Sequence, residues 1–508
     1  MKPKLSREIK MLIVALVILI TGNLILFLLF WLLGKYDNVY LDQILFQIKT
    51  PASGANKGLL SDAFIRIGGF AAILTLIEIF LYRLLSGGMK RLQKNEKYKI
   101  YSFSKTAAFF KKTAIPLALV TIITAVSLFI GKLKIIPYID AISTESDFIK
   151  EHYIAPTNEV LTFPDEKKNL IYIFLESMEV TYTSSADGGA QIKNYIPELT
   201  QLAYENVSFS NTERLGGALN YTGTTWTAAA MVSQTAGINI KVSLRGDDYG
   251  GEHSFLPGIT SLGEVLQNEG YVQTLLIGSD ATFAAKDSYF SENGNYNIVD
   301  INRLKEEGRL DEDYQVWWGY EDNKLFEYAK EELDKLYNTG KPFNFTMLTA
   351  DTHFPDGYLC ENCPDTHDRQ YANVLSCSSR QVYQFIEWLK TQPYYENTTI
   401  VLSGDHLTMD PQFLKDIDEH YTRTTYNCFI NSAVNPIKEK ERQFATFDMF
   451  PTTLSAMGVR IEGDRLGLGT DLFSASETLT EKYGYAQLDY ELQKKSTYYN
   501  EVFAGRKN

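Results

Sequence analysis

Three long apolar segments near the N-terminus limit the folds that this chain of 508 residues can adopt. They lie at residues 11–33, 67–85 and 113–131, and each approaches the roughly 20 residues that an α-helix needs to cross a bilayer. The first segment is too long for the apolar region of a cleavable signal peptide, and no small-residue cleavage site follows it. We therefore predict a membrane anchor with three transmembrane helices at residues 1–131.

The distribution of Lys and Arg predicts the orientation of this anchor. Residues 83–112, between the second and third segments, carry nine Lys or Arg, whereas residues 34–66 carry four. Four more basic residues precede the first segment. Because basic loops remain on the cytoplasmic side, three crossings place everything after residue 131 outside the cytoplasm. We expect a multi-pass protein of the cell membrane whose large domain is extracytoplasmic, either periplasmic or extracellular.

The charge of the chain divides between the same two regions. Residues 1–131 contain 17 Lys and Arg and 6 Asp and Glu, which gives a net charge of +11. Subtraction from the totals of 49 and 62 leaves 32 basic and 56 acidic residues for residues 132–508, a net charge of −24. An acidic region of this size argues against nucleic acid as a partner. An anionic substrate would need a metal ion or a helix N-terminus to hold it.

Strands and helices alternate along the remainder of the chain. Apolar runs of strand length begin at positions 170, 272, 342 and 398, and segments with helical periodicity separate them. This order is typical of an α/β domain with a mostly parallel central sheet flanked by helices. We predict that domain at residues 169–508, after a juxtamembrane linker of mixed polarity at residues 132–168.

Polar residues follow several of the predicted strands. Glu176 comes directly after the first strand, and Asp405 and His406 come after the fourth. Each residue alone is also consistent with an ordinary polar loop. The carboxyl ends of parallel strands share one edge of the sheet, however, so the three side chains should converge there. Two carboxylates and an imidazole suit Mn²⁺ or Zn²⁺ and leave a position open for a reacting oxygen.

Residues 218–234 (ALNYTGTTWTAAAMVSQ) place four threonines before or at the start of a predicted helix: Thr222, Thr224, Thr225 and Thr227. One N-cap needs one hydroxyl, so the others need another explanation. A hydroxyl bound to a divalent metal becomes a nucleophile, and a helix N-terminus favours a phosphate group. The pattern indicates phosphoryl or sulfuryl transfer through a covalent threonine intermediate. We expect Thr224 or Thr225 to cap the helix or touch the phosphate, and Thr222 to lie in the approach loop.

From about residue 169 to residue 474, the chain resembles the sulfatase-like phosphoglycerol transferases of the alkaline phosphatase superfamily. This group includes enzymes of the lipoteichoic acid synthase and phosphoglycerol transferase I types. The stretches that carry the resemblance are, in order, NLIYIFLESMEVTY, YTGTTWTAAAMVSQTAG, FLPGITSLGEVLQNEGY, GSDATFAAKDSYF, GKPFNFTMLTADTHFPDGYL, SGDHLTM and DMFPTTLSAMGVRIEGDRLGLG. So many blocks in the same order imply the alkaline-phosphatase-like fold for the extracytoplasmic domain.

The resemblance implies a role for each matching position. Glu176, Asp405 and His406 match the family's metal ligands. Thr227, directly after the tryptophan of the motif, matches the nucleophile and is itself a metal ligand. His353 matches a histidine near the substrate phosphate or the leaving group, and it could act as a general acid.

Two further positions fall in segments that border the head-group pocket of the family. These are Lys286 and Trp318, which are implied substrate-binding residues. For Lys286 the alternative is a solvated surface lysine, and for Trp318 the alternative is core packing. The chain departs from the family at Thr225, where a second glycine is normal.

The implied activity is transfer of glycerol phosphate from phosphatidylglycerol to a glycan or polyglycerol-phosphate acceptor, with one divalent metal. Mn²⁺ is the expected ion and Zn²⁺ the alternative. A phosphoethanolamine transferase would use the same mechanism, and a catalytically inactive domain that binds a polymer or a partner is an alternative of another class. Sulfatase activity is not expected, because the Cys/Ser-x-Pro-x-Arg motif is absent and the similar string CSSR at 377–380 lacks the proline.

The chain has four cysteines, of which Cys360 and Cys363 form a single C-x2-C pair. Such a pair suggests zinc or redox chemistry, but no second ligand pair follows at finger spacing. In an oxidising compartment we expect a disulfide among Cys360, Cys363 and Cys377, whose connectivity the sequence does not give. Cys428 is expected to be a buried strand residue.

Overall fold

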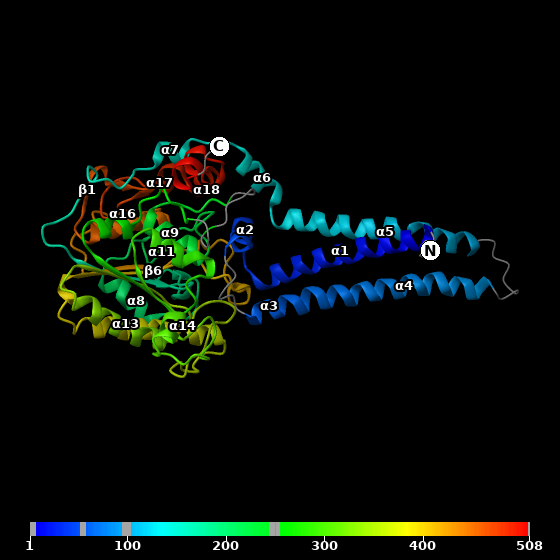
Figure 1. Ribbon diagram of the computed structural model, residues 1–508, viewed down its shortest axis with the longest axis horizontal. Coiled ribbons are helices and arrows are strands. Elements are labelled where there is room, and N and C mark those ends of the chain that lie inside the picture. Colours follow the sequence, from blue (N-terminus) through cyan, green and yellow to red (C-terminus); the bar gives the residue numbers. More distant parts are fainter. Residues whose placement is uncertain (1–6, 51–56, 94–102, 243–248, 250–253, 506–508) are drawn as a thin grey trace. The chain divides into compact units, whose positions relative to one another are not determined.

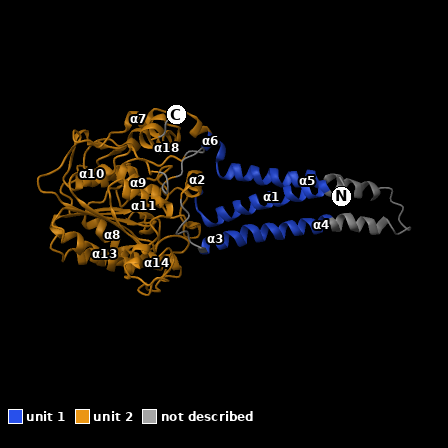
Figure 2. Cartoon of the chain, viewed as in Figure 1, with its two compact units in different colours: residues 1–39, 56–139 blue, residues 40–55, 140–508 orange. Residues whose placement is uncertain are grey.

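The computed structural model describes residues 7–50, 57–93, 103–242, 249 and 254–505. The chain forms two compact units, which Figure 2 colours separately. The first comprises Met1–Val39 and Asn56–Ile139, and the second comprises Tyr40–Ala55 and Asp140–Asn508. The two units are described in turn.

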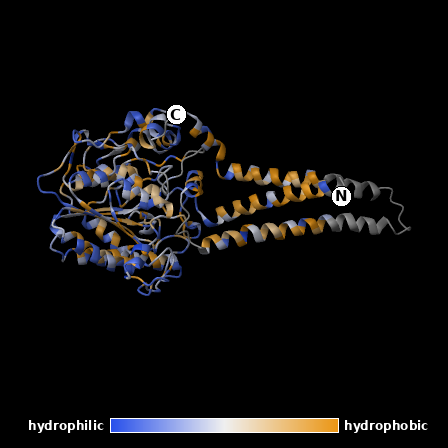
Figure 3. Cartoon of the chain, viewed as in Figure 1, coloured by the Kyte–Doolittle hydropathy of each residue, from blue (hydrophilic) through white to orange (hydrophobic). Residues whose placement is uncertain are grey.

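The first unit consists of helices, the longest of which are apolar. They are α1 (Arg7–Lys35), α3 (Lys57–Ala63), α4 (Phe70–Gln93), α5 (Phe103–Lys132) and the first part of α6 (Ile135–Ser143). A π-helical turn at Phe64–Gly69 joins α3 to α4. Three described stretches are long and apolar enough to cross a membrane: Lys10–Lys35, Gly58–Tyr82 and Ala114–Lys132 (Figure 3). They match the three predicted segments, although the second begins at 58 instead of 67.

Close packing and polar contacts join the helices of this unit. Gly22 of α1 faces the backbone of Ile122 in α5, where an added Cβ would lie 3.0 Å from the Ile122 Cα. Asn23, a strongly polar residue in an apolar segment, donates hydrogen bonds to Thr75 Oγ1 at 3.0 Å and to Glu78 Oε2 at 2.7 Å. Polar groups in such segments pair with one another because lipid offers no partner.

The second unit contains a central six-stranded sheet in the order β4-β3-β5-β2-β6-β7. Its strands are β2 (Asn169–Leu175), β3 (Val272–Ile277), β4 (Asn297–Val299), β5 (Phe343–Leu348), β6 (Thr398–Gly404) and β7 (Asn427–Ile430). All neighbours are parallel except β6 and β7. The predicted α/β class with a mostly parallel sheet is confirmed. The four predicted strands are the four central ones, and the short edge strands β4 and β7 complete the sheet.

Helices cover both faces of this sheet (Figure 1). On one face α8 (Pro197–Glu205), α13 (Asp322–Tyr337) and α14 (Gln370–Leu389) pack against alternate strand residues, such as Ile171 and Ile173 of β2. On the other face lie α9 (Thr227–Ala236) and α16 (Met449–Ala456). The Tyr172 hydroxyl reaches this side and donates to Gln234 Oε1 of α9 at 2.8 Å. Both faces are therefore buried, as the continuous apolar strands require.

Shorter elements complete the second unit. The remaining helices are α7 (Phe148–His152), α10 (Leu262–Asn268), α11 (Lys286–Glu292), α12 (Ile301–Glu306), α15 (Pro411–Leu414), α17 (Leu479–Tyr483) and α18 (Tyr485–Gln493). Two small antiparallel sheets pair β1 (Leu161–Thr162) with β8 (Arg460–Ile461) and β9 (Arg465–Leu466) with β10 (Gly469–Thr470).

The borders of the compact units differ from the predicted division at residues 131 and 168. The segment between the first two apolar stretches forms α2 (Leu41–Lys49), and it belongs to the second unit because Asp42 and Phe46 are buried there. Residues 140–168 also belong to it. Phe148 stacks on His152 and meets Tyr483 edge-on at 5.2 Å between ring centroids. Buried side chains thus tie both segments to the α/β domain.

Candidate active site

The ends of two adjacent strands bring three predicted ligands together. β2 and β6 are parallel, and Leu175 lies opposite Gly404 at their carboxyl ends. Glu176 therefore leaves the sheet beside Asp405 and His406, although 229 positions separate the first two residues in the sequence. All three side chains are buried, and their potential ligand atoms lie within 4.8 Å of one another. This arrangement could hold a metal ion.

Thr227 joins this group from the N-terminus of α9. Its hydroxyl donates to Glu176 Oε2 at 3.2 Å and lies 3.3 Å from His406 Nε2. His406 Nε2 in turn lies 3.6 Å from Glu176 Oε1 and 3.4 Å from Asp405 Oδ2. The structure thus places the four residues that the sequence suggested as metal ligands in one cluster. Thr227 is half-buried, whereas the other three are almost fully buried.

The donor set of this cluster fits a divalent cation. Asp405 Oδ1 accepts hydrogen bonds from the backbone N–H groups of Ser177 and His406, each at 2.7 Å. Asp405 Oδ2 is buried beside His406 Nε2 and has no hydrogen-bond partner among the described residues. His406 Nδ1 donates to the Leu407 carbonyl at 2.9 Å, which leaves the lone pair of Nε2 directed at the cluster. Two carboxylates, one imidazole and a hydroxyl are thereby free to bind one ion.

The electrostatics of the cluster favour a positive charge at its centre. Burial and the negative charge of Glu176 raise the pKa of Asp405 to about 8. Burial would also raise the pKa of Glu176, but the charges of His353 and His406 outweigh it, and this pKa is lowered. Burial would lower the pKa of His406, but Asp405 and Glu176 outweigh it and raise this pKa. A bound cation would allow both carboxylates to ionise together.

The N-terminus of α9 has no side-chain cap. The N-cap residue is Trp226, whose side chain makes no capping hydrogen bond. Thr224 instead closes a turn, because its hydroxyl donates to the Tyr221 carbonyl and accepts from the Tyr221 N–H, both at 2.9 Å. Thr225 Oγ1 is buried without a partner among the described residues. Neither threonine caps the helix, so its first N–H groups are available for an anion.

Helix α2 supports the loop that leads to Thr227. This support was not predicted from the sequence. The backbone of Gly223 has φ +81°, and its N–H donates to Asp42 Oδ2 at 2.9 Å. The Phe46 ring lies 5.2 Å from the Trp226 ring and 5.3 Å from the Tyr249 ring, measured between centroids. The signal in the sequence is the amphipathic pattern LDQILFQIK, which indicates a helix with one buried face but not where that face packs.

A second group of predicted residues lies around His353. Its Nδ1 donates to the Phe354 carbonyl at 2.6 Å, and its ring centroid lies 4.6 Å from that of Trp318. The Trp318 ring also meets the Phe283 ring at 5.5 Å. Lys286 is buried, donates to the Phe283 carbonyl and lies 5.1 Å from the Phe283 ring centroid. These contacts join His353, Trp318, Phe283 and Lys286 into one continuous group, which is called the wall around His353.

The burial of this wall affects its titratable groups. Burial lowers the pKa of Lys286 to about 8, although Asp280, Asp287 and Glu176 act in the opposite direction. Burial also lowers the pKa of His353. Lys286 is therefore not the solvated surface lysine that was the alternative interpretation. Trp318 is half-buried, and its Nε1 has no partner among the described residues.

Several residues that position the ligands were not predicted. The Ser177 hydroxyl donates to Glu176 Oε1 at 2.7 Å, and the Glu176 N–H donates to Thr349 Oγ1 at 3.0 Å. Gln234 Nε2 donates to the carbonyls of Gly404 at 3.0 Å and Asp405 at 3.3 Å. These contacts fix the backbone that carries the ligands. Serine, threonine and glutamine are so common that their types alone give no signal in one sequence.

The chain is similar to known proteins over its α/β domain. A model of the Sulfatase family matches residues 168–459, more than half of the chain. The chain is 32% identical over 330 residues to phosphoglycerol transferase I of Salmonella choleraesuis (strain SC-B67). It is 31% identical over 321 residues to phosphoglycerol transferase I of Escherichia coli O127:H6 (strain E2348/69 / EPEC). The two matches cover 63% and 62% of this chain, but only 41% and 40% of the respective relatives.

Two solved structures are similar to this chain at low sequence identity. The lipoteichoic acid synthase LtaP from Listeria monocytogenes is 20% identical, with a TM-score of 0.47 and coverage of 66% of this chain and 83% of that one. The lipooligosaccharide phosphoethanolamine transferase A (EptA) from Neisseria meningitidis is 14% identical, with a TM-score of 0.48 and coverage of 91% and 87%.

Proposed function

The chain belongs to the sulfatase family, and from this premise we propose that it is a membrane-anchored phosphoglycerol transferase. It moves glycerol phosphate from phosphatidylglycerol to an extracytoplasmic glycan or polyglycerol-phosphate acceptor. The similarity to phosphoglycerol transferase I supports this choice of donor. The three apolar helices support a multi-pass anchor that keeps the site beside a lipid substrate. The excess of basic residues between the second and third spans supports an extracytoplasmic domain.

The observation that carries the proposal is the position of the Thr227 hydroxyl. It lies 3.2 Å from Glu176 Oε2 and 3.3 Å from His406 Nε2, at the uncapped N-terminus of α9. A nucleophile in this position has metal-ligand groups on one side and helix N–H groups on the other. The N–H groups would stabilise the negative charge on the phosphoryl oxygens. A threonine with only a structural role would need neither the metal-ligand groups nor the free N–H groups beside its hydroxyl.

The reaction proceeds in two displacements at phosphorus. Thr227 gives up its proton to water, and its oxygen forms a bond to phosphorus while the bond from phosphorus to the diacylglycerol oxygen breaks. His353, in its protonated form, donates its Nε2 proton to that leaving oxygen as a general acid. A hydroxyl of the acceptor then attacks phosphorus and gives its proton to His353, which is neutral after the first step. The bond from phosphorus to the Thr227 oxygen breaks, and this oxygen takes a proton from water.

A divalent cation, Mn²⁺ or Zn²⁺, held by Glu176, Thr227, Asp405 and His406 would lower the pKa of the Thr227 hydroxyl and offset phosphoryl charge. Lys286 and Trp318 belong to the wall around His353, and we assign them to the substrate head group. The Lys286 ammonium would attract the phosphate. The half-buried Trp318 ring, whose Nε1 has no partner among the described residues, would contact the glycerol.

The test is mass spectrometry of the full-length protein after exposure to phosphatidylglycerol. We expect a glycerol-phosphate adduct on Thr227 and release of diacylglycerol. A parallel sample receives phosphatidylethanolamine, and a third receives phosphatidylglycerol after treatment with a chelator. Diacylglycerol release from phosphatidylethanolamine alone would replace the proposal with a phosphoethanolamine transferase. The absence of turnover with both lipids, in protein loaded with metal, would favour a domain that only binds a polymer or a partner.

A further inference from the structure

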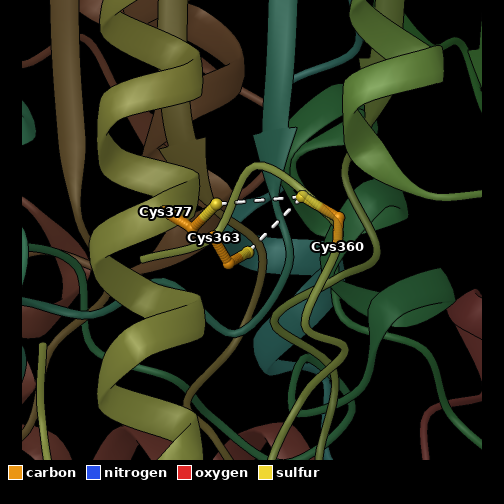
Figure 4. A group of neighbouring side chains, drawn as sticks. All are labelled: Cys360, Cys363 and Cys377. Carbon is orange, nitrogen blue, oxygen red and sulfur yellow. Dashed lines mark hydrogen bonds between the residues drawn. The ribbon is translucent and has the colours of Figure 1, made fainter. Parts of the chain in front are cut away.

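Three cysteine side chains converge at a second place in the α/β unit (Figure 4). Cys360 and Cys363 lie in the loop between β5 and α14, and Cys377 lies in α14. Cys360 Sγ is 3.4 Å from Cys363 Sγ and 3.9 Å from Cys377 Sγ. All four cysteines of the chain are described, and each is a free thiol, so the expected disulfide is not formed in this structure.

The separation of the sulfur atoms matches the edges of a metal coordination tetrahedron. Zinc–sulfur bonds of about 2.3 Å in tetrahedral geometry place neighbouring sulfurs about 3.8 Å apart. The two observed separations lie on either side of that value, and all three sulfurs lie within 4.8 Å of one another. A disulfide would use two of these thiols and would leave the position of the third unexplained.

The amide of Gln381 occupies a position suited to a fourth ligand. Its Nε2 lies 3.3 Å from both Cys360 Sγ and Cys377 Sγ. Its Oε1 is buried and has no partner among the described residues, and Gln381 as a whole is only 8% exposed. The two ends of a glutamine amide have nearly the same shape, so rotation by 180° places the oxygen toward the sulfurs. That rotation supplies an oxygen ligand one turn away from Cys377 on the same helix.

The surroundings allow an ion to enter and balance its charge. Cys363, Arg380 and Gln381 line an open cavity of about 650 Å³, which gives access from solvent. Three thiolates around a divalent ion carry a net charge of −1. The guanidinium of Arg380, whose Nη2 lies 3.8 Å from Cys377 Sγ, offsets this charge.

From these contacts we propose that Cys360, Cys363 and Cys377, with Gln381 as fourth ligand, form a structural site for a thiophilic divalent cation such as Zn²⁺. On binding, the three thiols lose one proton each to solvent, and three sulfur–metal bonds form. The site would fasten the loop after β5 to α14. That loop begins beside His353, so the ion holds the wall of the active site in place. This inference concerns a different set of ligands from the proposed transferase reaction and does not depend on its substrate.

The test counts metal ions and thiols in the full-length protein, purified in detergent without chelator or reductant and supplied with Zn²⁺. Elemental analysis of the wild-type chain should find two zinc ions. Cys360→Ser should lose one of the two, and His406→Ala should lose the other. Cys428→Ser is the matched control, because Cys428 is a buried cysteine of β7 outside the cluster, and it should keep both ions.

A spectroscopic measurement on His406→Ala keeps the proposal testable if Cys360→Ser does not fold. Loading that variant with Co²⁺ should give the intense near-ultraviolet absorption of cobalt–thiolate bonds. Absence of this absorption, or a zinc count unchanged by Cys360→Ser, would overturn the site. So would an intact mass lower by two hydrogens, with a disulfide between two of the three cysteines and no bound ion. Failure of the transferase reaction with both sites loaded would contradict the proposed function alone.

Discussion

Four threonines within six positions take different parts in the structure. Thr222 lies in a loop where its N–H donates to Asp489 Oδ1 at 2.8 Å, and Thr224 closes a turn with its hydroxyl. Thr225 has a buried hydroxyl without a described partner, and Thr227 contacts Glu176 and His406. Of these four hydroxyls, only that of Thr227 contacts the ligand cluster in the described structure. The departure from the family at Thr225 therefore leaves Thr227 as the better nucleophile.

Replacement of the nucleophile gives the sharpest prediction. Thr227→Ala should lower transfer from phosphatidylglycerol by at least about 1,000-fold and abolish the covalent adduct, because among the described residues no other hydroxyl contacts both Glu176 and His406. Peptide mass spectrometry locates the adduct, and release of labelled diacylglycerol gives the rate. Thr222→Ala is the matched control and should keep the adduct. An adduct on Thr225 in the wild-type chain would move the nucleophile to that residue.

The buried carboxyl group of Asp42 should make the stability of the protein depend on pH. Burial raises its pKa to about 6 from 3.8, against the opposing effect of the N–H groups of Gln43 and Gly223, and Asp489 raises it further. Between these two pKa values the folded chain holds a proton that the unfolded chain releases, so stability falls as the pH rises. This group should make the protein about 1.4 kcal/mol more stable at pH 5 than at pH 8.

The measurement is thermal unfolding of the purified protein at both pH values, followed by tryptophan fluorescence. Asp42→Asn cannot ionise and retains an oxygen for the Gly223 N–H, so it should lose this share of the pH dependence. Equal pH dependence in the wild-type chain and the variant would show that the carboxylate is already ionised at pH 5.

At the level of single residues, the sequence was sufficient to predict which side chains meet at the sheet edge and insufficient to predict which residues support them. Glu176, Asp405 and His406 could be predicted because the carboxyl ends of parallel strands meet at one edge. Ser177 and Gln234 could not, because their contribution depends on a hydrogen bond to a particular backbone group in the folded chain. The predicted disulfide implied that two of Cys360, Cys363 and Cys377 lie close together. The convergence of all three free thiols was not predicted, because spacing along the chain does not give distances between sulfur atoms.

Helix α2 is the element whose position the sequence failed to give. Its amphipathic pattern predicts a helix with a buried side, and Asp42 and Phe46 are indeed buried. Such a pattern is equally consistent with a helix on a membrane surface. Packing against Trp226 and Gly223 decides between the two, and those residues are remote in sequence. The central strands, by contrast, were predictable because a continuous apolar run buried on both faces has few alternatives.

Loss of the α2 contact should weaken the site from a distance. Phe46 is fully buried, and Phe46→Ala should cost about 3–5 kcal/mol of the free energy that holds α2 in place. Ile48, on the same helix, has 75% of its side chain exposed, so Ile48→Ala should change stability by less than about 0.5 kcal/mol. The unfolding temperature and the transfer rate should both fall in Phe46→Ala, and both should remain unchanged in Ile48→Ala. A normal transfer rate in a destabilised Phe46→Ala protein would separate α2 from catalysis.

For the whole molecule, a crossing by each of the three apolar helices would place the two ends of the chain on opposite sides of the membrane. The basic residues predict a cytoplasmic N-terminus. An epitope tag before Met1 should be inaccessible to antibody in intact cells with an opened outer envelope, whereas a tag after Asn508 should be accessible. Both tags should react after the membrane is permeabilised. Labelling of both tags, or of the N-terminal tag alone, before permeabilisation would contradict the predicted orientation.

The contact between Asp42 and Gly223 joins residues that are 181 positions apart, which has a consequence for biosynthesis. The ribosome makes α2 long before it makes the loop that α2 supports. Until Trp226 and Tyr249 emerge, the Phe46 ring has neither of its native aromatic partners. Exposed apolar side chains of this kind promote aggregation and recruit chaperones. Chains that end before this loop should therefore fail to complete folding. These incomplete chains should remain bound to an extracytoplasmic chaperone.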